Sequence, residues 1–219
     1  MPPSATYIAL LEACAEPGCP ICRVEHDAAL RYISGLFYEH VNDFNMRERL
    51  RASLGFCRQH AHMTVDELQG NALGIALLYQ DVLKLATHHL DDRQAIPAPV
   101  RKCPACEQRD LSMMRTVSEI SKNIEDDALV SALKSSEGLC LFHLRHTLRH
   151  MRTPEKRDVL ITIQHDIIAR LRVDLGEFIR KNDYRFSKES FGPERDSWKR
   201  AVSMVSGSKI SKKEKEETK

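Results

Sequence analysis

The sequence lacks the features that would attract it to a membrane or to a polyanion. Its formal net charge is only +2, from 33 basic and 31 acidic side chains in 219 residues, so no strong overall field favours nucleic acid or anionic lipid. The longest apolar stretch, ALGIALLY, is far shorter than the roughly 18 residues that a membrane-spanning helix requires. The N-terminal stretch has neither the basic residues nor the apolar length of a secretory signal. We expect a cytoplasmic protein with no membrane partner, for which nucleic acid is an unfavoured ligand.

Alternating polar and apolar residues, the pattern of a half-buried strand, are also absent at any useful length. Apolar residues recur instead at helical spacing in two long segments, at about residues 71–90 and 156–181. A hydrophobic content of 42% is ordinary for a globular protein and argues against global disorder. The fold class that we predict is all-α.

What the sequence does have is a duplicated pattern of cysteine and histidine. A C-P-x-C pair is followed after about 34 residues by C-x-x-H, and the whole arrangement occurs twice. The two copies are offset by 84 residues at the first cysteine (19 to 103) and by 83 at the third (57 to 140). Leucine, serine and glycine align as well, at Leu50 and Leu133, Ser53 and Ser136, and Gly55 and Gly138. We therefore predict a helical bundle of two tandem, pseudo-symmetric repeats.

The repeats set the expected organisation of the chain. Residues 1–92 form the first helical metal-binding repeat, 93–102 a linker with two prolines, and 103–182 the second repeat. Residues 183–207 form a C-terminal docking segment and helix, and 208–219 a disordered basic tail.

Within the docking segment, one helical face is apolar and is the face that we expect to pack on the bundle. Its members are Trp198, Ala201, Val202 and Val205. Charged residues also lie among aromatic ones from RKNDYRF to DSWKRA, residues 180–201. This mixture is typical either of a recognition surface or of local capping and pairing, and we favour the second interpretation.

Local signals place the ligand pairs at helix starts. Cys19 and Cys103 stand where an N-cap residue stands, and the proline after each suits the first helical position, where its missing N–H costs nothing. A short helix opened by Asp43 and closed by Gly55 follows, and DDALVSALKSSEG repeats this device in the second copy.

Each copy supplies three thiolates and one imidazole, which is the Cys₃His set of structural zinc sites. Residues three apart at a helix N-terminus project to the same side, so each pair can chelate one ion. The predicted ligands are Cys19, Cys22, Cys57, His60, Cys103, Cys106, Cys140 and His143. We expect a C-P-x-C pair to share its ion with the C-x-x-H pair of the same copy, although pairing between copies stays open. Two zinc ions are the predicted cofactors, and two [4Fe–4S] clusters are the alternative, because thiolates bind both.

Other cysteine chemistry fits the sequence less well. Cys14, Cys19 and Cys22 imitate the ligand spacing of plant-type ferredoxins, but Ala98 stands where the second copy would need the equivalent of Cys14. Covalent haem needs a histidine after C-x-x-C, and thioredoxin chemistry needs a βαβ pattern; the sequence has neither. Ferritin-type di-iron sites need Glu-x-x-His pairs, which the sequence also lacks.

Three more histidines, His62, His146 and His150, follow the predicted ligands. The last two would share a helical face with His143, which could form a second metal site or a proton relay. Such histidines are more often exposed or held by hydrogen bonds, so we do not count them as ligands.

Several segments together resemble a known family. They are CPIC, YEHVNDFNMRERLRASLGFCRQHA, CPAC, GLCLFH, EFIRKNDYRF and DSWKRA. The likeness extends over nearly the whole chain except the tail, and it is to an uncharacterised bacterial and archaeal family that is defined as a domain of unknown function. This resemblance implies a prokaryotic origin and no particular activity.

The function that we expect is non-enzymatic: a metal-binding adaptor or assembly protein that works with a protein partner. The alternative is electron transfer or redox sensing by two iron–sulfur clusters. The Arg-rich stretch HLRHTLRHMR keeps nucleic acid open as a minor hypothesis. A hydrolase or transferase is disfavoured, because no set of nucleophile and base and no phosphate-binding glycine loop can be recognised.

Overall fold

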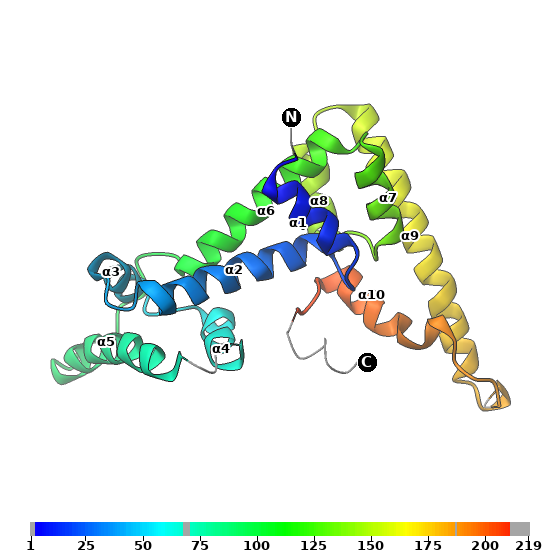
Figure 1. Ribbon diagram of the computed structural model, residues 1–219. Coiled ribbons are helices and arrows are strands. Elements are labelled where there is room, and N and C mark those ends of the chain that lie inside the picture. The colour runs from blue at the N-terminus through cyan, green and yellow to red at the C-terminus, as the bar shows by residue number, and fades with distance from the viewer. Residues whose placement is uncertain (1–2, 68–70, 187, 211–219) are drawn as a thin grey trace. The chain divides into compact units, whose positions relative to one another are not determined.

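The structure is a computed structural model that describes residues 3–67, 71–186 and 188–210. These residues form helices joined by turns and contain no strand (Figure 1). The prediction of an all-α fold is therefore confirmed. Within the described residues, no helix combines the length and the apolar character needed to cross a membrane.

The helices follow one another in the order that the two repeats predict. They are α1 (Ala5–Cys14), α2 (Pro20–Glu39), α3 (Phe44–Ala52), α4 (Arg58–Glu67), α5 (Ala72–Asp91), α6 (Pro104–Asn123), α7 (Asp127–Ser135), α8 (Leu141–His150), α9 (Pro154–Lys181) and α10 (Ser197–Ser206). Two short 3₁₀ helices, η2 (Tyr184–Phe186) and η3 (Pro193–Asp196), precede α10. Helices α2 to α5 and α6 to α9 are the two copies of the same series: long, short, short and long.

The chain divides into two compact units that do not coincide with the repeats. The first unit contains residues 3–24 and 113–210, and the second contains residues 25–67 and 71–112. Helix α2 begins in the first unit and ends in the second, whereas α6 begins in the second and ends in the first. Each unit therefore takes residues from both copies of the repeat.

Each unit has a hydrophobic core of its own. In the first unit, buried side chains of α6, α7 and α9 such as Ile120, Leu133 and Ile163 pack together. In the second unit, α2 contributes Ile33 and Leu36 to a cluster with α3, α4 and α5. Four of the six ligand cysteines, two in each cluster, are themselves part of these cores: Cys19, Cys140, Cys103 and Cys106.

The repeated helix starts arise from repeated capping residues. Asp43 caps α3 by accepting a hydrogen bond from the Met46 N–H at 2.7 Å, and Asp126 caps α7 through the Leu129 N–H at 3.1 Å. Both carboxylates satisfy N–H groups that a helix leaves unpaired at its first turn. Helix α1, capped by Ser4, was not predicted, because its apolar residues form no stripe at helical spacing.

The C-terminal helix α10 packs against α8 and α9, but of the four residues that we predicted for the packed face only Ala201 contacts the core. Ser197 and Met204 are its buried residues, whereas Trp198, Val202 and Val205 are 48%, 59% and 62% exposed. Met204 contacts a buried amide of α9: Gln164 Nε2 lies 3.3 Å from Met204 Sδ. The apolar stripe therefore predicted the packed face of this short helix correctly at Ala201 and wrongly at its other three residues.

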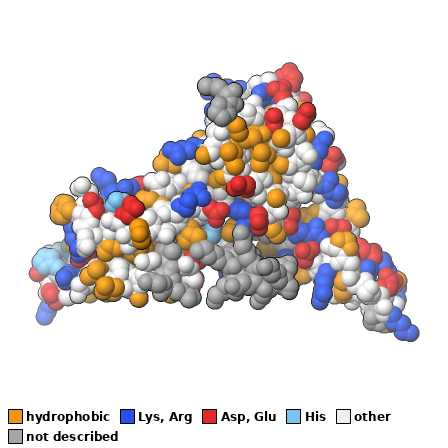
Figure 2. Space-filling model, viewed as in Figure 1, with side chains coloured by type: hydrophobic (Ala, Val, Ile, Leu, Met, Phe, Trp, Pro, Cys, Tyr) orange, Lys and Arg blue, Asp and Glu red, His pale blue; other side chains and the backbone are white. Residues whose placement is uncertain are grey.

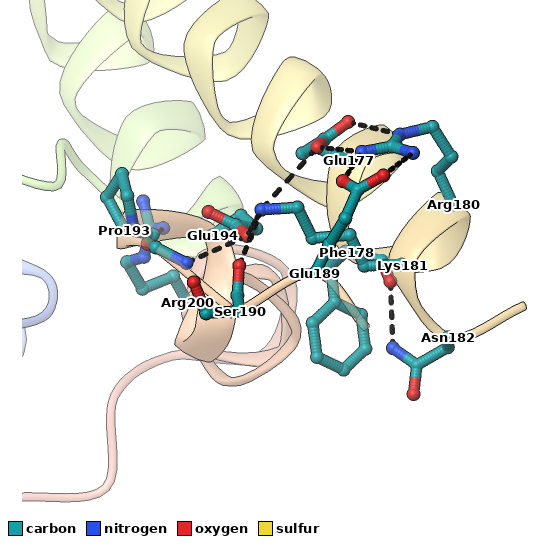
Figure 3. Close-up of polar contacts among 11 residues, drawn as sticks. Glu177, Phe178, Arg180, Lys181, Asn182, Glu189, Ser190, Pro193, Glu194 and Arg200 are labelled. Atoms are coloured by element: carbon teal, nitrogen blue, oxygen red, sulfur yellow. Dashed lines mark hydrogen bonds and ion pairs between the residues drawn. The ribbon is translucent and has the colours of Figure 1, made fainter. Parts of the chain in front are cut away.

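The turn between α9 and α10 is tied down by charged side chains, as Figure 3 shows. Lys181 donates to Glu194 Oε1 at 2.7 Å, and the same oxygen accepts the Gly192 N–H at 2.9 Å. Arg200 donates to the Pro193 carbonyl at 2.9 Å. The local pairing that we favoured over a recognition surface is thus present. Blue and red side chains are also interspersed on the face drawn in Figure 2, in keeping with the small net charge.

The predicted disordered tail begins at Ser208, and the structure describes it only to Ile210; residues 211–219 lie outside the described residues. The prediction is wrong for Ser208. Its side chain and its backbone both form hydrogen bonds with the chain around Cys19 and Cys22.

Candidate metal centres

All eight predicted ligands come together, in two groups of four. In each group the ligand atoms lie within 4.8 Å of one another, so each group could hold one metal ion. The first centre consists of Cys19, Cys22, Cys140 and His143, and the second of Cys57, His60, Cys103 and Cys106. Each centre lies wholly within one compact unit.

In the first centre, the imidazole of His143 faces all three thiols through its Nδ1 atom. Nδ1 lies 3.5 Å from Cys19 Sγ, 3.4 Å from Cys22 Sγ and 3.3 Å from Cys140 Sγ. The sulfur atoms of Cys22 and Cys140 are 3.9 Å apart. Four donor atoms therefore surround one small volume.

The second centre has the same arrangement. His60 Nδ1 lies 3.3 Å from both Cys57 Sγ and Cys106 Sγ and 3.6 Å from Cys103 Sγ. The sulfur atoms of Cys57 and Cys106 are 3.5 Å apart. The duplicated sequence has thus produced two centres of the same chemistry and nearly the same geometry.

The expected pairing within each copy is wrong, because each centre joins the C-P-x-C of one copy to the C-x-x-H of the other. The reason is the length of the helix that each C-P-x-C begins. Helix α2 has 20 residues and is therefore about 30 Å long, so the chain that leaves Cys22 reaches Cys57 only after passing into the second unit. There it meets the start of α6, which returns the chain to the first unit.

All four ligand pairs occupy the same place on a helix. The first residue of each pair is the residue just before a helix, and its carbonyl accepts the N–H four residues later. These hydrogen bonds are 3.2 Å at Cys19, 2.8 Å at Cys57, 3.1 Å at Cys103 and 2.8 Å at Cys140. The second residue of each pair lies one turn further on. Two helix N-termini therefore converge on each centre, and their partial positive charge favours thiolates.

Burial controls the ionisation of these groups. It raises the pKa of Cys106 to about 12 and raises the pKa of Cys19 as well. It lowers the pKa of His60 to about 4, which keeps this imidazole neutral at physiological pH. In the first centre, hydrogen bonds from Cys19 and Cys22 lower the pKa of Cys140. The buried thiols can therefore all ionise only when a cation is bound, and the neutral imidazole can act as a ligand of that cation.

Ser208, near the C-terminal end of the described chain, forms hydrogen bonds with two ligand residues of the first centre. Its backbone N–H lies 3.4 Å from Cys22 Sγ, and its hydroxyl accepts the Cys19 N–H at 2.7 Å. A hydrogen bond to a ligand sulfur orients the ligand and spreads its charge. No sequence signal pointed to Ser208, because a single serine after a helix follows no pattern.

Gln164 is the second residue that the sequence did not indicate. Its side chain is 3% exposed. It accepts the Leu139 N–H at 2.9 Å and donates to the Leu139 carbonyl at 3.0 Å. Both backbone groups of the residue before Cys140 are thereby fixed, and the amide of α9 holds this ligand loop in place.

Gly55 closes α3, as predicted, since its N–H donates to the Leu50 carbonyl at 2.7 Å. The same prediction is wrong for Gly138, because α7 ends at Ser135 and the Gly138 N–H donates to Ser136 Oγ at 3.0 Å. Both glycines have a positive φ, of +86° and +80°. A side chain in this region costs about 1–2 kcal/mol. At Gly138 a Cβ would also lie 3.0 Å from Gln164 Nε2, whereas at Gly55 the nearest atom is Tyr79 Cε1 at 3.6 Å.

We therefore expect Gly138→Ala to lower the free energy of unfolding more than Gly55→Ala does, by at least ~1 kcal/mol for a disturbed hydrogen bond. Urea denaturation of the two metal-loaded variants measures this difference, and equal losses would show that Gln164 does not constrain the loop.

A buried ion pair joins α2 to α4, the helix that carries His60. His26 Nε2 lies 2.9 Å from Glu67 Oε1, and both side chains are 9% exposed. Burial alone would lower the pKa of His26, but its hydrogen bonds with Asp27 and Glu67 outweigh burial and raise the pKa above its usual value of 6.5. A raised pKa means that the pair stabilises the fold fully below pH 6.5 and that this contribution is lost as the pH rises through the folded-state pKa.

We therefore expect the stability difference between the natural protein and His26→Gln to shrink as the pH is raised from about 6 to 8.5. Urea denaturation at each pH measures the difference, and subtracting the variant removes the effect of pH on metal affinity. His62→Gln is the control, since His62 is exposed on α4. A difference that grows with pH would contradict a charged His26.

The remaining predicted candidates are not part of either centre. His62 is exposed, and His146 packs on the Phe142 ring with the centroids 4.5 Å apart. Cys14 is buried, and burial raises the pKa of its thiol to about 12. No third group of metal-ligating side chains is found in residues 3–67, 71–186 and 188–210.

Comparison with known proteins gives a family but no activity. The model of a family of unknown function, DUF6062, matches residues 4–101 and again residues 92–212. The chain is also 25% identical over 204 residues to the "Uncharacterized 23.9 kDa protein in xynA 3'region" of Caldicellulosiruptor sp. (strain Rt8B.4), covering 90% of this chain and 99% of that protein. No solved structure matches. The two matched regions overlap at residues 92–101, and each contains one copy of the C-P-x-C and C-x-x-H pattern.

Proposed function

The chain belongs to DUF6062, and from its two centres we propose that it is a two-zinc protein whose ions hold a helical scaffold for a protein partner. The observation that carries this proposal is the spacing of the ligand atoms. The geometry itself shows that the two Cys₃His groups could each bind a metal ion.

The spacing supports one tetrahedral zinc ion in each centre. Zinc binds sulfur at about 2.3 Å and imidazole nitrogen at about 2.0–2.1 Å, so tetrahedral ligands are about 3.8 Å apart for two sulfurs and about 3.6 Å for sulfur and nitrogen. The sulfur pairs in the two centres are 3.9 Å and 3.5 Å apart. The distances from sulfur to Nδ1 range from 3.3 to 3.6 Å. All of these distances match a single ion.

The same distances argue against a [4Fe–4S] cluster. Such a cluster binds each of its four ligands to a different iron, so the ligands must be spread around the whole cube. Ligands that share one ion are much closer together. Donor atoms that all lie within 4.8 Å of one another therefore favour the single ion.

Four protein ligands leave no open position on a tetrahedral ion, which is the feature that separates structural zinc sites from catalytic ones. Each ion would connect the N-termini of two helices that are distant in sequence. We infer that the metals replace part of the core and that the protein acts as an adaptor or assembly subunit. A cytoplasmic location is part of the proposal, and the seven free cysteines support a reducing compartment.

Elemental analysis of protein purified without oxygen tests the proposal. We expect two zinc ions per chain and a colourless protein. Iron with acid-labile sulfide in a brown protein would contradict it and favour electron transfer or redox sensing. Fewer than two metal ions per fully folded chain would show that one of the two groups is not a metal centre.

A further inference from the structure

A cavity of about 390 Å³ lies in the first unit, away from the metal ligands. Its walls come from three parts of the chain: the last turns of α6, the end of α8 with the loop that follows, and the first turn of α9. The lining residues are Ser118, Ser121, Lys122, Arg149, His150, Met151, Arg152, Thr153 and Lys156. A volume of this size is within the range of small-molecule sites.

The lining carries charge of one sign. Four of its side chains are permanent cations, a fifth is His150, and none is acidic. Lys156 is the only one of the four that forms an ion pair within the described part of the chain, with Glu125 at 3.2 Å. It also donates to the Lys122 carbonyl at 3.0 Å. Lys122, Arg149 and Arg152 are left without a carboxylate partner among the described residues.

Helix ends explain only part of this cluster. Lys122 and Arg149 are in the last turns of α6 and α8, where cations commonly offset the negative end of the helix dipole. Arg152 belongs to the loop and Lys156 to the first turn of α9, where a cation faces the positive end of the dipole. Because Lys156 is already paired with Glu125, the positive charge that an anion would offset is that of Lys122, Arg149 and Arg152, around a hollow whose lining has no acidic residue.

Hydrogen-bond donors are present in the form that a phosphoryl group requires. The guanidinium forks of Arg149 and Arg152 can each bind two phosphate oxygens. Thr153 precedes α9 but makes no capping hydrogen bond with its side chain, so its hydroxyl is available to a ligand. The Ser121 hydroxyl donates to the Val117 carbonyl at 2.8 Å, so it can act towards a ligand only as an acceptor.

We propose that this cavity binds the phosphoryl group of a small molecule, as a phosphomonoester or a pyrophosphate. The cavity is larger than a single phosphate, which leaves room for a second phosphate or for the rest of the ligand. Arg149 and Arg152 bind the phosphate oxygens, and Lys122 and Lys156 supply the remaining charge. Neither metal centre takes part, so the site is separate from the proposed structural zinc.

Calorimetric titration of the zinc-loaded full chain with inorganic phosphate and with pyrophosphate, at constant ionic strength, tests the proposal. We expect saturable binding of one pyrophosphate per chain. Arg149→Gln and Arg152→Gln should each weaken it by about tenfold or more, since a charge-assisted bond is lost. Arg145→Gln is the matched control, because Arg145 lies one turn earlier on α8 and does not line the cavity; it should change the affinity less than about twofold.

Several outcomes would overturn the proposal. One is the absence of saturable binding of either anion by the folded protein, and another is equal weakening by the control variant. Sulfate that binds as tightly as phosphate and pyrophosphate would reduce the site to a general attraction for anions. A mixed-sequence oligonucleotide that binds where pyrophosphate does not would point to a nucleic-acid backbone instead. Circular dichroism of each variant shows that the fold is intact.

Discussion

Replacing Cys57 and Cys103 together with serine should remove one metal ion per chain, whereas replacing Cys103 and Cys140 together should remove two. The first pair of cysteines belongs to a single centre, in which a second substitution has nothing further to remove. The second pair takes one ligand from each centre. Each single variant should lose one ion, because three remaining ligands hold zinc far less tightly than four.

This pair of double variants separates the two possible pairings. If the ions instead joined the C-P-x-C and C-x-x-H of the same copy, the results would be exchanged: Cys57 with Cys103 would remove two ions and Cys103 with Cys140 only one. Inductively coupled plasma mass spectrometry of the purified variants gives the metal content per chain. Cys14→Ser is the control, since this buried thiol belongs to neither centre, and it should retain both ions.

Removing the metal with a strong chelator should unfold the second unit before the first. Structural zinc contributes about 10–16 kcal/mol in small zinc-binding peptides, which is comparable to the whole stability of a typical domain, about 5–15 kcal/mol. The second unit depends on its ion more strongly, because its hydrophobic cluster has 11 buried residues and that of the first has 18. Two of those 11 are the ligands Cys103 and Cys106.

Hydrogen exchange followed by mass spectrometry measures this order. During chelation, peptides from α3 and α5 should lose protection first, and peptides from α7 and α9 later. Adding zinc back should restore both, which distinguishes metal loss from irreversible thiol oxidation. A chelated protein that keeps its exchange protection and its melting temperature would show that the ions do not hold the fold together.

Much of this fold could be predicted because its signals are local. Pro20 and Pro104 at helix starts, Asp43 as a cap and Gly55 as a helix end each act through neighbouring backbone atoms. The long stripe of α9 is equally visible, because the burial of Leu160, Ile163, Ile167 and Leu171 on one side imposes its period. The stripe of α5 also predicted a helix, although Leu78 is the only apolar residue that this helix buries. The eight ligands were identifiable for the same reason, since each pair lies within one helical turn.

The features that escaped prediction depend on contacts between distant segments. The pairing of the centres follows from where α2 and α6 lead the chain, which the spacing of cysteines does not reveal. Gln164 and Ser208 are single polar residues that act on Leu139 and on Cys19 and Cys22. The prediction for the packed face of α10 was right only at Ala201, because the helix buries Ser197 and Met204 and leaves Trp198, Val202 and Val205 exposed.

Because each centre joins ligands from both copies of the repeat, the order of synthesis determines which centre can form first. The ligands of the second centre, residues 57 to 106, lie between those of the first, which extend from 19 to 143. Once Cys106 has left the ribosome, all four ligands of the second, inner centre are present. The first, outer centre is still incomplete at that point, because Cys140 and His143 are synthesised later. Closing the inner loop first shortens the free chain between the outer ligands and so lowers the entropy lost when they meet. The N-terminal cysteines are thus the earliest ligands to be made and the last to be joined to their partners.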